Sequence, residues 1–307
     1  MTFADLHCDT ASYIYEKKES LFNSDGHISL EKLKKYDSPI QVFALWLDRK
    51  YYSKAFAATL DMIKYFKNEV MKNGDKISIV KNAADIKDNA GRVSAMLSIE
   101  GCEALEGDME NLYALYDEGV RMATLTWNYR NCVATGVRES DKGGGLTDFG
   151  REAVKEMERL GIIVDVSHLS DEGFYDVERH TSKPFIASHS NCRAICKFPR
   201  NLTDDQLRVI SGRGGVVGIN LCEDFLSDSG RADMDDILRH AERMLDICGE
   251  NCVCLGCDLD GIPSTPEGVA SVEGIEGIIG AFEKNFGKTV AEKIAVGNFM
   301  RITGELL

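Results

Sequence analysis

The sequence predicts a single α/β domain built as a (β/α)₈ barrel. Eight short apolar, β-rich runs recur along the chain, and helical stretches separate them. These runs are residues 2–6, 40–47, 93–99, 122–125, 162–166, 185–187, 216–219 and 253–255. Strands that alternate with helices indicate a parallel sheet, and eight such units in 307 residues favour a closed TIM-type barrel over an open doubly wound sheet.

The stretches between the runs have helical periodicity. In residues 152–160, Ala153, Val154 and Met157 fall on one face, and Gly161 supplies a stop signal. Residues 51–73, after the second run, predict a long helix. No Pro- or Ser-rich linker or repeat marks a boundary, so residues 1–307 are expected to form one domain.

Composition excludes several classes of protein. The net charge is -14, with 36 basic residues against 50 acidic ones, so no basic stripe for nucleic acid is expected. No apolar run approaches the roughly 18 residues that span a bilayer, and the N-terminus lacks a signal-peptide pattern. We therefore expect a cytoplasmic protein without a membrane partner, in which the ten cysteines are mostly reduced thiols.

Residues able to do chemistry gather where the predicted strands end. His7 and Asp9 are two apart and so point to the same side of an extended chain. The carboxyl ends of parallel barrel strands converge on one rim, which predicts a shared pocket. Its expected members are His7, Asp9, Glu100, His168, His189 and Asp258. The other three histidines, His27, His180 and His240, lie in polar or helical stretches and are expected at the surface.

Three imidazoles and two or three carboxylates suit a borderline divalent ion, zinc first, with manganese, cobalt or iron as alternatives. Five or six ligands exceed one tetrahedral site. Two Zn²⁺ ions per chain that share a bridging carboxylate would use them all, with a hydroxide between the ions as the nucleophile. The pattern therefore predicts a hydrolase.

Seven segments in order match one known family. They are residues 5–10, 99–101, 145–150, 165–168, 188–190, 200–204 and 256–261. On these motifs the chain resembles the membrane dipeptidases, also called renal dipeptidases, of the amidohydrolase superfamily. The resemblance implies hydrolysis of dipeptides, leaves open whether a C-terminal D-residue is accepted, and allows a homodimer.

The resemblance also implies roles for individual residues. His7 and Asp9 would hold one zinc, His168 and His189 the other, and Glu100 would bridge them. Asp258 would hydrogen-bond the hydroxide and pass its proton to the leaving amine. Arg200 would clamp the C-terminal carboxylate of the substrate, a task that suits a planar bidentate donor.

Two positions depart from the family pattern. Trp127 stands where animal members have a His that contacts the substrate carbonyl oxygen. We hypothesise that Asn128 or Asn131 donates a hydrogen bond there instead. Phe225 stands where some relatives have a Tyr, so side-chain preference is expected to differ.

Two other functions compete with the dipeptidase. Binuclear deacetylases, lactonases and phosphotriesterase-type enzymes usually begin with His-x-His and use a carboxylated Lys as bridge, whereas this chain has His-x-Asp and Glu100. A catalytically inactive binding barrel is the third hypothesis. The complete set of ligands at the strand ends disfavours it.

Overall fold

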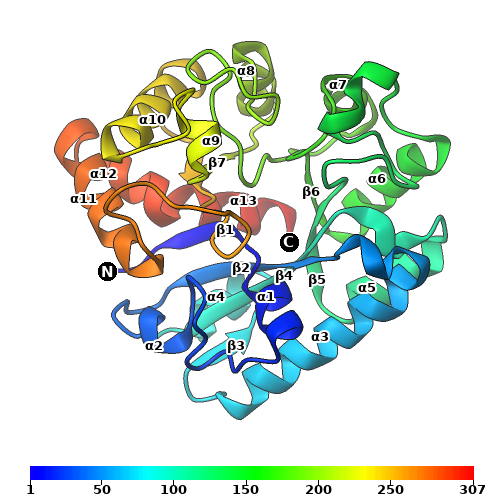
Figure 1. The fold of residues 1–307 in the computed structure, drawn as a ribbon, viewed down its shortest axis with the longest axis horizontal. Coiled ribbons are helices and arrows are strands. Elements are labelled where there is room, and N and C mark those ends of the chain that lie inside the picture. The colour runs from blue at the N-terminus through cyan, green and yellow to red at the C-terminus, as the bar shows by residue number, and fades with distance from the viewer.

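The computed structural model describes residues 1–307, and its centre is a curled parallel sheet (Figure 1). The order across the sheet is β6-β5-β4-β2-β1-β8-β7, and β3 pairs with β4 off this path. The strands are β1 (Ala4–Cys8), β2 (Ile40–Trp46), β3 (Ile77–Ile79), β4 (Val93–Glu100), β5 (Val120–Thr124), β6 (Ile163–Asp165), β7 (Val217–Ile219) and β8 (Val253–Leu255). The parallel α/β architecture predicted from the sequence is confirmed.

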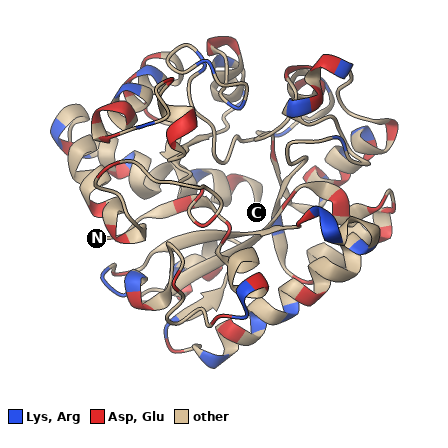
Figure 2. Ribbon diagram, in the orientation of Figure 1, with Lys and Arg blue, Asp and Glu red and all other residues tan.

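Helices surround the sheet, and charged residues of both signs are spread along them (Figures 1 and 2). The helices are α1 (Thr10–Lys17), α2 (Leu30–Leu33), α3 (Ala55–Lys72), α4 (Ala83–Asp88), α5 (Met109–Asp117), α6 (Asp148–Leu160), α7 (Asp171–His180), α8 (Asp204–Gly212), α9 (Glu223–Leu226), α10 (Met234–Cys248), α11 (Ile275–Phe286), α12 (Lys288–Glu292) and α13 (Asn298–Leu306). None of them combines the length and the apolarity needed to cross a bilayer.

Both predicted helices are present. The stretch 51–73 is a 3₁₀ turn, Arg49–Lys54, that leads into α3. Helix α6 includes 152–160 and begins where the Thr147 hydroxyl accepts the Gly150 N–H at 2.9 Å. It ends at Gly161, whose φ of 78° is the left-handed conformation that glycine favours at a helix end.

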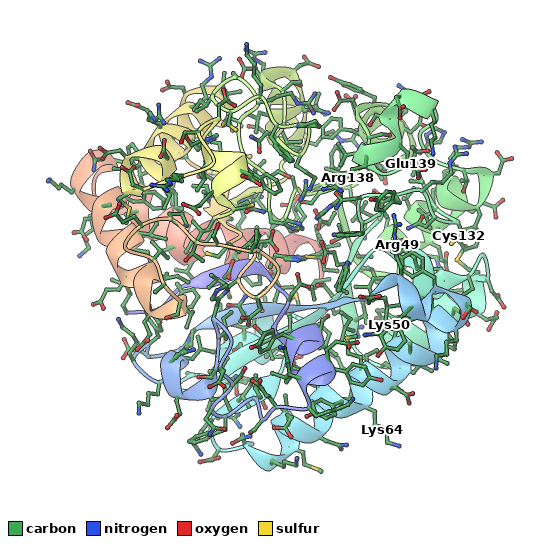
Figure 3. All side chains as sticks on the ribbon, viewed as in Figure 1. Arg49, Lys50, Lys64, Cys132, Arg138 and Glu139 are labelled. Atoms are coloured by element: carbon green, nitrogen blue, oxygen red, sulfur yellow. The ribbon has the colours of Figure 1, made fainter.

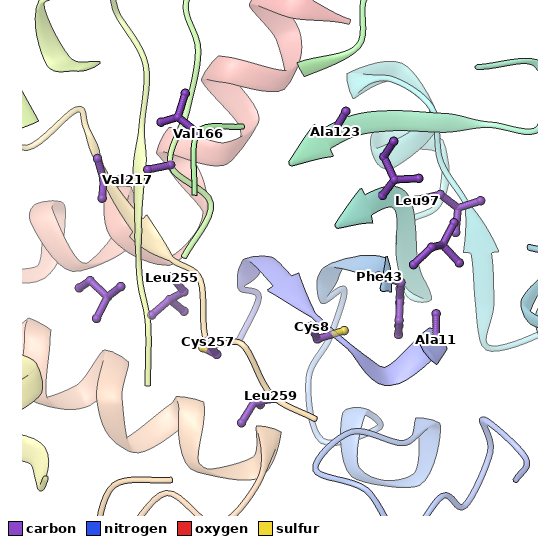
Figure 4. Close-up of a cluster of buried hydrophobic side chains, with 14 of the residues drawn as sticks. Cys8, Ala11, Phe43, Leu97, Ala123, Val166, Val217, Leu255, Cys257 and Leu259 are labelled. Carbon is purple, nitrogen blue, oxygen red and sulfur yellow. The ribbon is translucent and has the colours of Figure 1, made fainter. Parts of the chain in front are cut away.

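Both faces of the strands are buried, which explains why they read as almost continuous apolar runs. Neighbours such as Val42 and Phe43, or Met96 and Leu97, belong to two different apolar clusters because successive side chains point to opposite faces. The outer cluster, between strands and helices, includes Phe43, Leu97 and Leu255 (Figure 4). The inner cluster is completed by Phe299, Ile302 and Leu306 of α13.

Two strand predictions need correction. The predicted strand at 185–187 is not regular: it makes isolated parallel bridges, Ile186 to Asp165 and Ala187 to Val217, between the edge strands β6 and β7. Pro184, which has no N–H to donate, precedes it, and only three residues follow before the turn at Ser188. Strand β3 was missed because its three residues lie in a polar stretch.

The expectation that His240 is exposed is also wrong. His240 is fully buried on α10, where Nδ1 accepts the Cys192 N–H at 3.0 Å and Nε2 lies 3.0 Å from the Leu226 carbonyl oxygen. Two partners for one imidazole make burial tolerable.

A candidate binuclear metal centre

The strand ends bring the six predicted side chains together in one buried cluster. Glu100, at the end of β4, places Oε1 2.9 Å from His168 Nε2 and 3.7 Å from His189 Nε2. Its other oxygen, Oε2, lies 3.7 Å from His7 Nε2. Ligand atoms of His7, Asp9 and Asp258 also lie within 4.8 Å of one another. Glu100 therefore stands between two groups of potential ligands.

Several of these atoms lack a partner within the protein. His7 Nδ1 and Nε2, Asp9 Oδ1 and Glu100 Oε2 are all buried without a hydrogen bond. Unpartnered buried polar atoms are costly. A bound cation would satisfy them, so this donor set fits divalent metal ions.

The surroundings of His168 and His189 strengthen that fit. His168 Nδ1 lies 3.0 Å from Asn128 Oδ1, and His189 Nδ1 lies 2.7 Å from Ser188 Oγ, which itself donates to Asp165. Both contacts place the ring proton on Nδ1 and leave a lone pair on Nε2. The two Nε2 atoms are only 2.9 Å apart. Two lone pairs facing each other beside a carboxylate repel unless a cation lies among them.

Electrostatics agree with neutral imidazoles at these two positions. Burial and the charge of Arg200 lower the pKa of His168 to about 4, and burial together with His7 and Arg200 lowers the pKa of His189. At His7, burial is outweighed by the carboxylates of Glu100, Asp9 and Asp258, so its pKa rises to about 10. His7 thus occupies the most negative part of the cluster, where a cation is most strongly stabilised.

Two buried aspartates hold the ligand-bearing segments, and their role was not predicted. Asp165 accepts the N–H groups of Ser167 and Ser188 at 3.0 and 2.8 Å and the Thr124 hydroxyl at 2.5 Å. Asp5 accepts the Cys257 N–H at 2.7 Å and the Gln41 side chain at 3.0 Å. Asp5 lies two residues before His7 and Asp165 three residues before His168, a spacing visible in the sequence.

Asn220 is a further residue missed from the sequence. It follows β7, a strand end to which no candidate was assigned. Its side-chain amide donates to Asp258 Oδ2 at 2.8 Å and so orients that carboxylate. Its position immediately after an apolar run was the signal that could have found it.

Glycine is required at two positions, Gly218 and Gly256, that lie against the segment carrying His189. A Cβ on Gly218 or on Gly256 would lie within 2 Å of the Ser188 carbonyl oxygen. Any larger residue would displace Ser188 and with it His189.

His168 and Asp258 have left-handed backbones, with φ values of 69° and 59°. Such conformations are uncommon outside glycine and persist where neighbouring contacts hold them. Here the two side chains belong to the ligand cluster, through contacts with Glu100 and His7.

A cavity with two adjoining lobes opens over the cluster. The first lobe, of 420 Å³, is lined by Asp9, Trp46, Glu100, Trp127 and Asp258 among others. The second, of 310 Å³, contains Arg200. Asn128, His168, Cys222, Phe225 and Pro263 line both lobes, so the metal cluster and Arg200 face one continuous space.

Arg200 is a buried cation without a carboxylate partner. It is 5% exposed, its Nε has no hydrogen bond, and no carboxylate lies within 4 Å. Its guanidinium packs 5.5 Å from the centre of the Phe225 ring, and burial lowers its pKa. A buried guanidinium in this state is suited to an anionic ligand.

The structure separates the two asparagine candidates. Asn128 lines both lobes and its Oδ1 contacts His168. Asn131 lines neither lobe, because its amide is used within its own loop: it donates to the Leu125 carbonyl and accepts from Val133 and Ala134. Of the two, only Asn128 therefore faces the cavity. Trp127 lines the first lobe, edge-to-face against Trp46 at 5.3 Å.

Comparison with known proteins agrees with this geometry. The family model for membrane dipeptidases, peptidase family M19, matches residues 1–306. The chain belongs to the membrane dipeptidase family. The metallo-dipeptidase predicted from the sequence is thereby confirmed.

Individual relatives in the membrane dipeptidase family match this chain over most of its length. An uncharacterized protein in the pqqA 5' region of Klebsiella pneumoniae is 36% identical over 77% of this chain and 91% of its own. An uncharacterized dipeptidase of Schizosaccharomyces pombe is 33% identical over 80% of this chain and 64% of its own. A metallo peptidase from Rhodobacter sphaeroides, crystallised with a phosphinate mimic of the dipeptide L-Ala-D-Ala, superposes with a TM-score of 0.93 at 25% identity, covering 100% of this chain and 99% of that one.

Proposed function

We propose that this chain is a zinc dipeptidase that holds two Zn²⁺ ions and cleaves dipeptides, including those with a C-terminal D-residue. The observation that carries the proposal is that the ligand cluster and the unpaired Arg200 face one cavity. The L-Ala-D-Ala mimic bound by the Rhodobacter sphaeroides relative supports the stereochemistry.

The cluster divides naturally between two ions. His7 and Asp9 would hold one, His168 and His189 the other, and Glu100 would bridge them, because its two oxygens face different histidines. Bound ions would polarise the scissile carbonyl group and activate water for attack. Zinc suits the mixture of imidazole and carboxylate ligands.

Asp258 is the proposed proton carrier. Asn220 holds Oδ2, while Oδ1 faces His7 at 3.9 Å and remains available. Burial raises the pKa of Asp258 to about 6, against the opposing effects of His7, Asn220 and Arg200. A carboxylate with such a pKa can take a proton from the attacking water and deliver it to the leaving amine.

Arg200 and Asn128 are the proposed substrate contacts. Arg200 would bind the C-terminal carboxylate through two parallel hydrogen bonds, with its guanidinium held against Phe225. A carboxylate site one residue beyond the scissile bond selects dipeptides over longer peptides. The side-chain nitrogen of Asn128 would donate a hydrogen bond to the peptide carbonyl oxygen. In animal members of the family, a His at the position of Trp127 makes this contact.

The test is hydrolysis by zinc-loaded protein of L-Ala-L-Ala, L-Ala-D-Ala, tri-alanine and N-acetyl-alanine. We expect both dipeptides to be cleaved and tri-alanine to resist. The Asp258→Asn variant should still bind zinc, and its kcat should be lower by a factor of about 10²–10⁴. The control Asp246→Asn, an exposed position on α10, should behave as wild type. Folded, zinc-loaded protein that cleaves neither dipeptide would refute the proposal, and cleavage of N-acetyl-alanine alone would indicate a deacetylase.

A further inference from the structure

A second arginine, Arg138, borders the lobe that contains Arg200. It lies in the 3₁₀ turn Val137–Lys142, and its N–H donates to the Asn128 carbonyl at 3.0 Å, which fixes this turn to the edge of the cavity. The side chain is exposed and has no carboxylate within 4 Å, although the chain has 50 acidic residues. Arg138 is therefore a free cation at the mouth of the substrate lobe.

The neighbours of Arg138 increase the positive charge there. Arg138 contacts the Tyr129 hydroxyl and is the main reason that the pKa of Tyr129 is lowered. Arg49 lies 3.7 Å from the centre of the same Tyr129 ring and has no ion pair either. Figure 3 shows Arg49 and Arg138 on the same side of the molecule. Two arginines without an ion pair therefore meet at one tyrosine ring beside the lobe.

The rest of the lobe suits a short side chain with an anionic end. Val137, Phe198, Phe225 and Pro263 supply apolar wall. Asp224 is the single carboxylate among the lining residues, and it pairs with neither arginine. Two guanidinium groups against one carboxylate leave the lobe net positive.

We infer that Arg138 is a specificity-determining residue that selects dipeptides with an acidic C-terminal side chain, of the aspartate or glutamate class. The inference rests on the proposed function: if Arg200 binds the α-carboxylate, the side chain of the same residue occupies the same lobe. Its methylene groups contact the apolar wall, and its carboxylate meets Arg138 at the mouth.

The test compares kcat/KM for isosteric pairs, Ala-Asp with Ala-Asn and Ala-Glu with Ala-Gln, each with an L- and a D-residue at the C-terminus. We expect wild type to prefer the acid about tenfold in at least one pair. The preference should shrink as salt is raised, because the mouth is exposed to solvent. Arg138→Gln should reduce the acid-to-amide ratio about tenfold, and Arg138→Lys should retain part of it.

Arg208→Gln is the matched control, since Arg208 is an exposed, unpaired arginine on α8 outside the cavity. It removes the same charge and should leave the ratio unchanged. Equal rates for acid and amide in wild type would overturn the inference while leaving the dipeptidase intact. An unchanged ratio in folded Arg138→Gln would overturn the assignment to Arg138. If no dipeptide of either kind is cleaved, the proposed function itself fails. Should Arg138→Gln not fold, the wild-type ratio and Arg138→Lys still decide.

Discussion

At the scale of single residues, His240 shows how burial couples ionisation to stability. Burial lowers the pKa of His240 to about 4 in the folded chain, whereas in the unfolded chain this pKa has the ordinary value of about 6.5. Just below the pKa of the unfolded state, His240 is protonated in the unfolded chain but remains neutral in the folded chain. The stability of the fold is therefore lost as pH falls from about 6.5 toward about 4.

This sign gives a testable outcome. Between pH 7 and pH 5.5, urea titrations should show the free energy of unfolding of wild type falling by about 1 kcal/mol more than that of His240→Gln, which cannot titrate. Parallel curves for wild type and His240→Gln would contradict the assignment.

At the scale of elements, the segment 185–187 joins the edge strands β6 and β7. Ile186 makes backbone hydrogen bonds to Val164 and Val166, Ala187 makes them to Val216 and Gly218, and Asp165 adds two contacts to Ser188 beyond them. Because Ser188 also contacts the ring of His189, Asp165 links the integrity of the sheet to the geometry of a proposed metal ligand.

Asp165→Asn should therefore weaken both properties. The amide nitrogen that replaces Oδ2 cannot accept from the Thr124 and Ser188 hydroxyls, so we expect a loss of about 2 kcal/mol in the free energy of unfolding. Zinc affinity, measured by competition with a chromogenic chelator, should fall about tenfold or more. Asp246→Asn serves again as the control. Wild-type zinc affinity in the folded Asp165→Asn protein would show that the Asp165–Ser188 contact does not orient His189.

At the scale of the whole molecule, the metal centre lies where β1, β4, β6 and β8 end, so ions bound there would connect distant parts of the chain. A ligand that binds only the folded state stabilises it by about 4 kcal/mol at a thousandfold excess over its Kd. For a chain of this size each kcal/mol raises Tm by about 1.5 °C. Removing zinc with a chelator should lower Tm by several degrees, and adding zinc back should restore it.

Glu100→Ala provides the control for this experiment, since it removes the proposed bridging ligand. Its Tm should respond weakly to zinc. A wild-type Tm indifferent to chelator and to added zinc would argue against resident metal ions.

The sequence by itself determined the alternation of strands and helices, the family, and the candidate ligands, because these depend on local patterns. Apolar runs mark strands buried on both faces, and parallel strands present their carboxyl ends on one rim whatever their order. His7, Asp9, Glu100, His168, His189 and Asp258 could thus be expected together before their distances were known. Seven of the eight predicted runs became regular strands.

Only the tertiary structure decided which groups are paired and which are free. His240 lies in a polar helical sequence yet is buried, because the Cys192 N–H and the Leu226 carbonyl meet its ring from distant segments. Asn131 and Asn128 look equivalent in sequence, but the amide of Asn131 donates to the Leu125 carbonyl oxygen within its own loop. Arg138 and Arg200 likewise differ from other unpaired arginines, such as Arg208, in lining the cavity. Local sequence patterns do not show pairing, because partners are set by contacts between residues far apart in the chain.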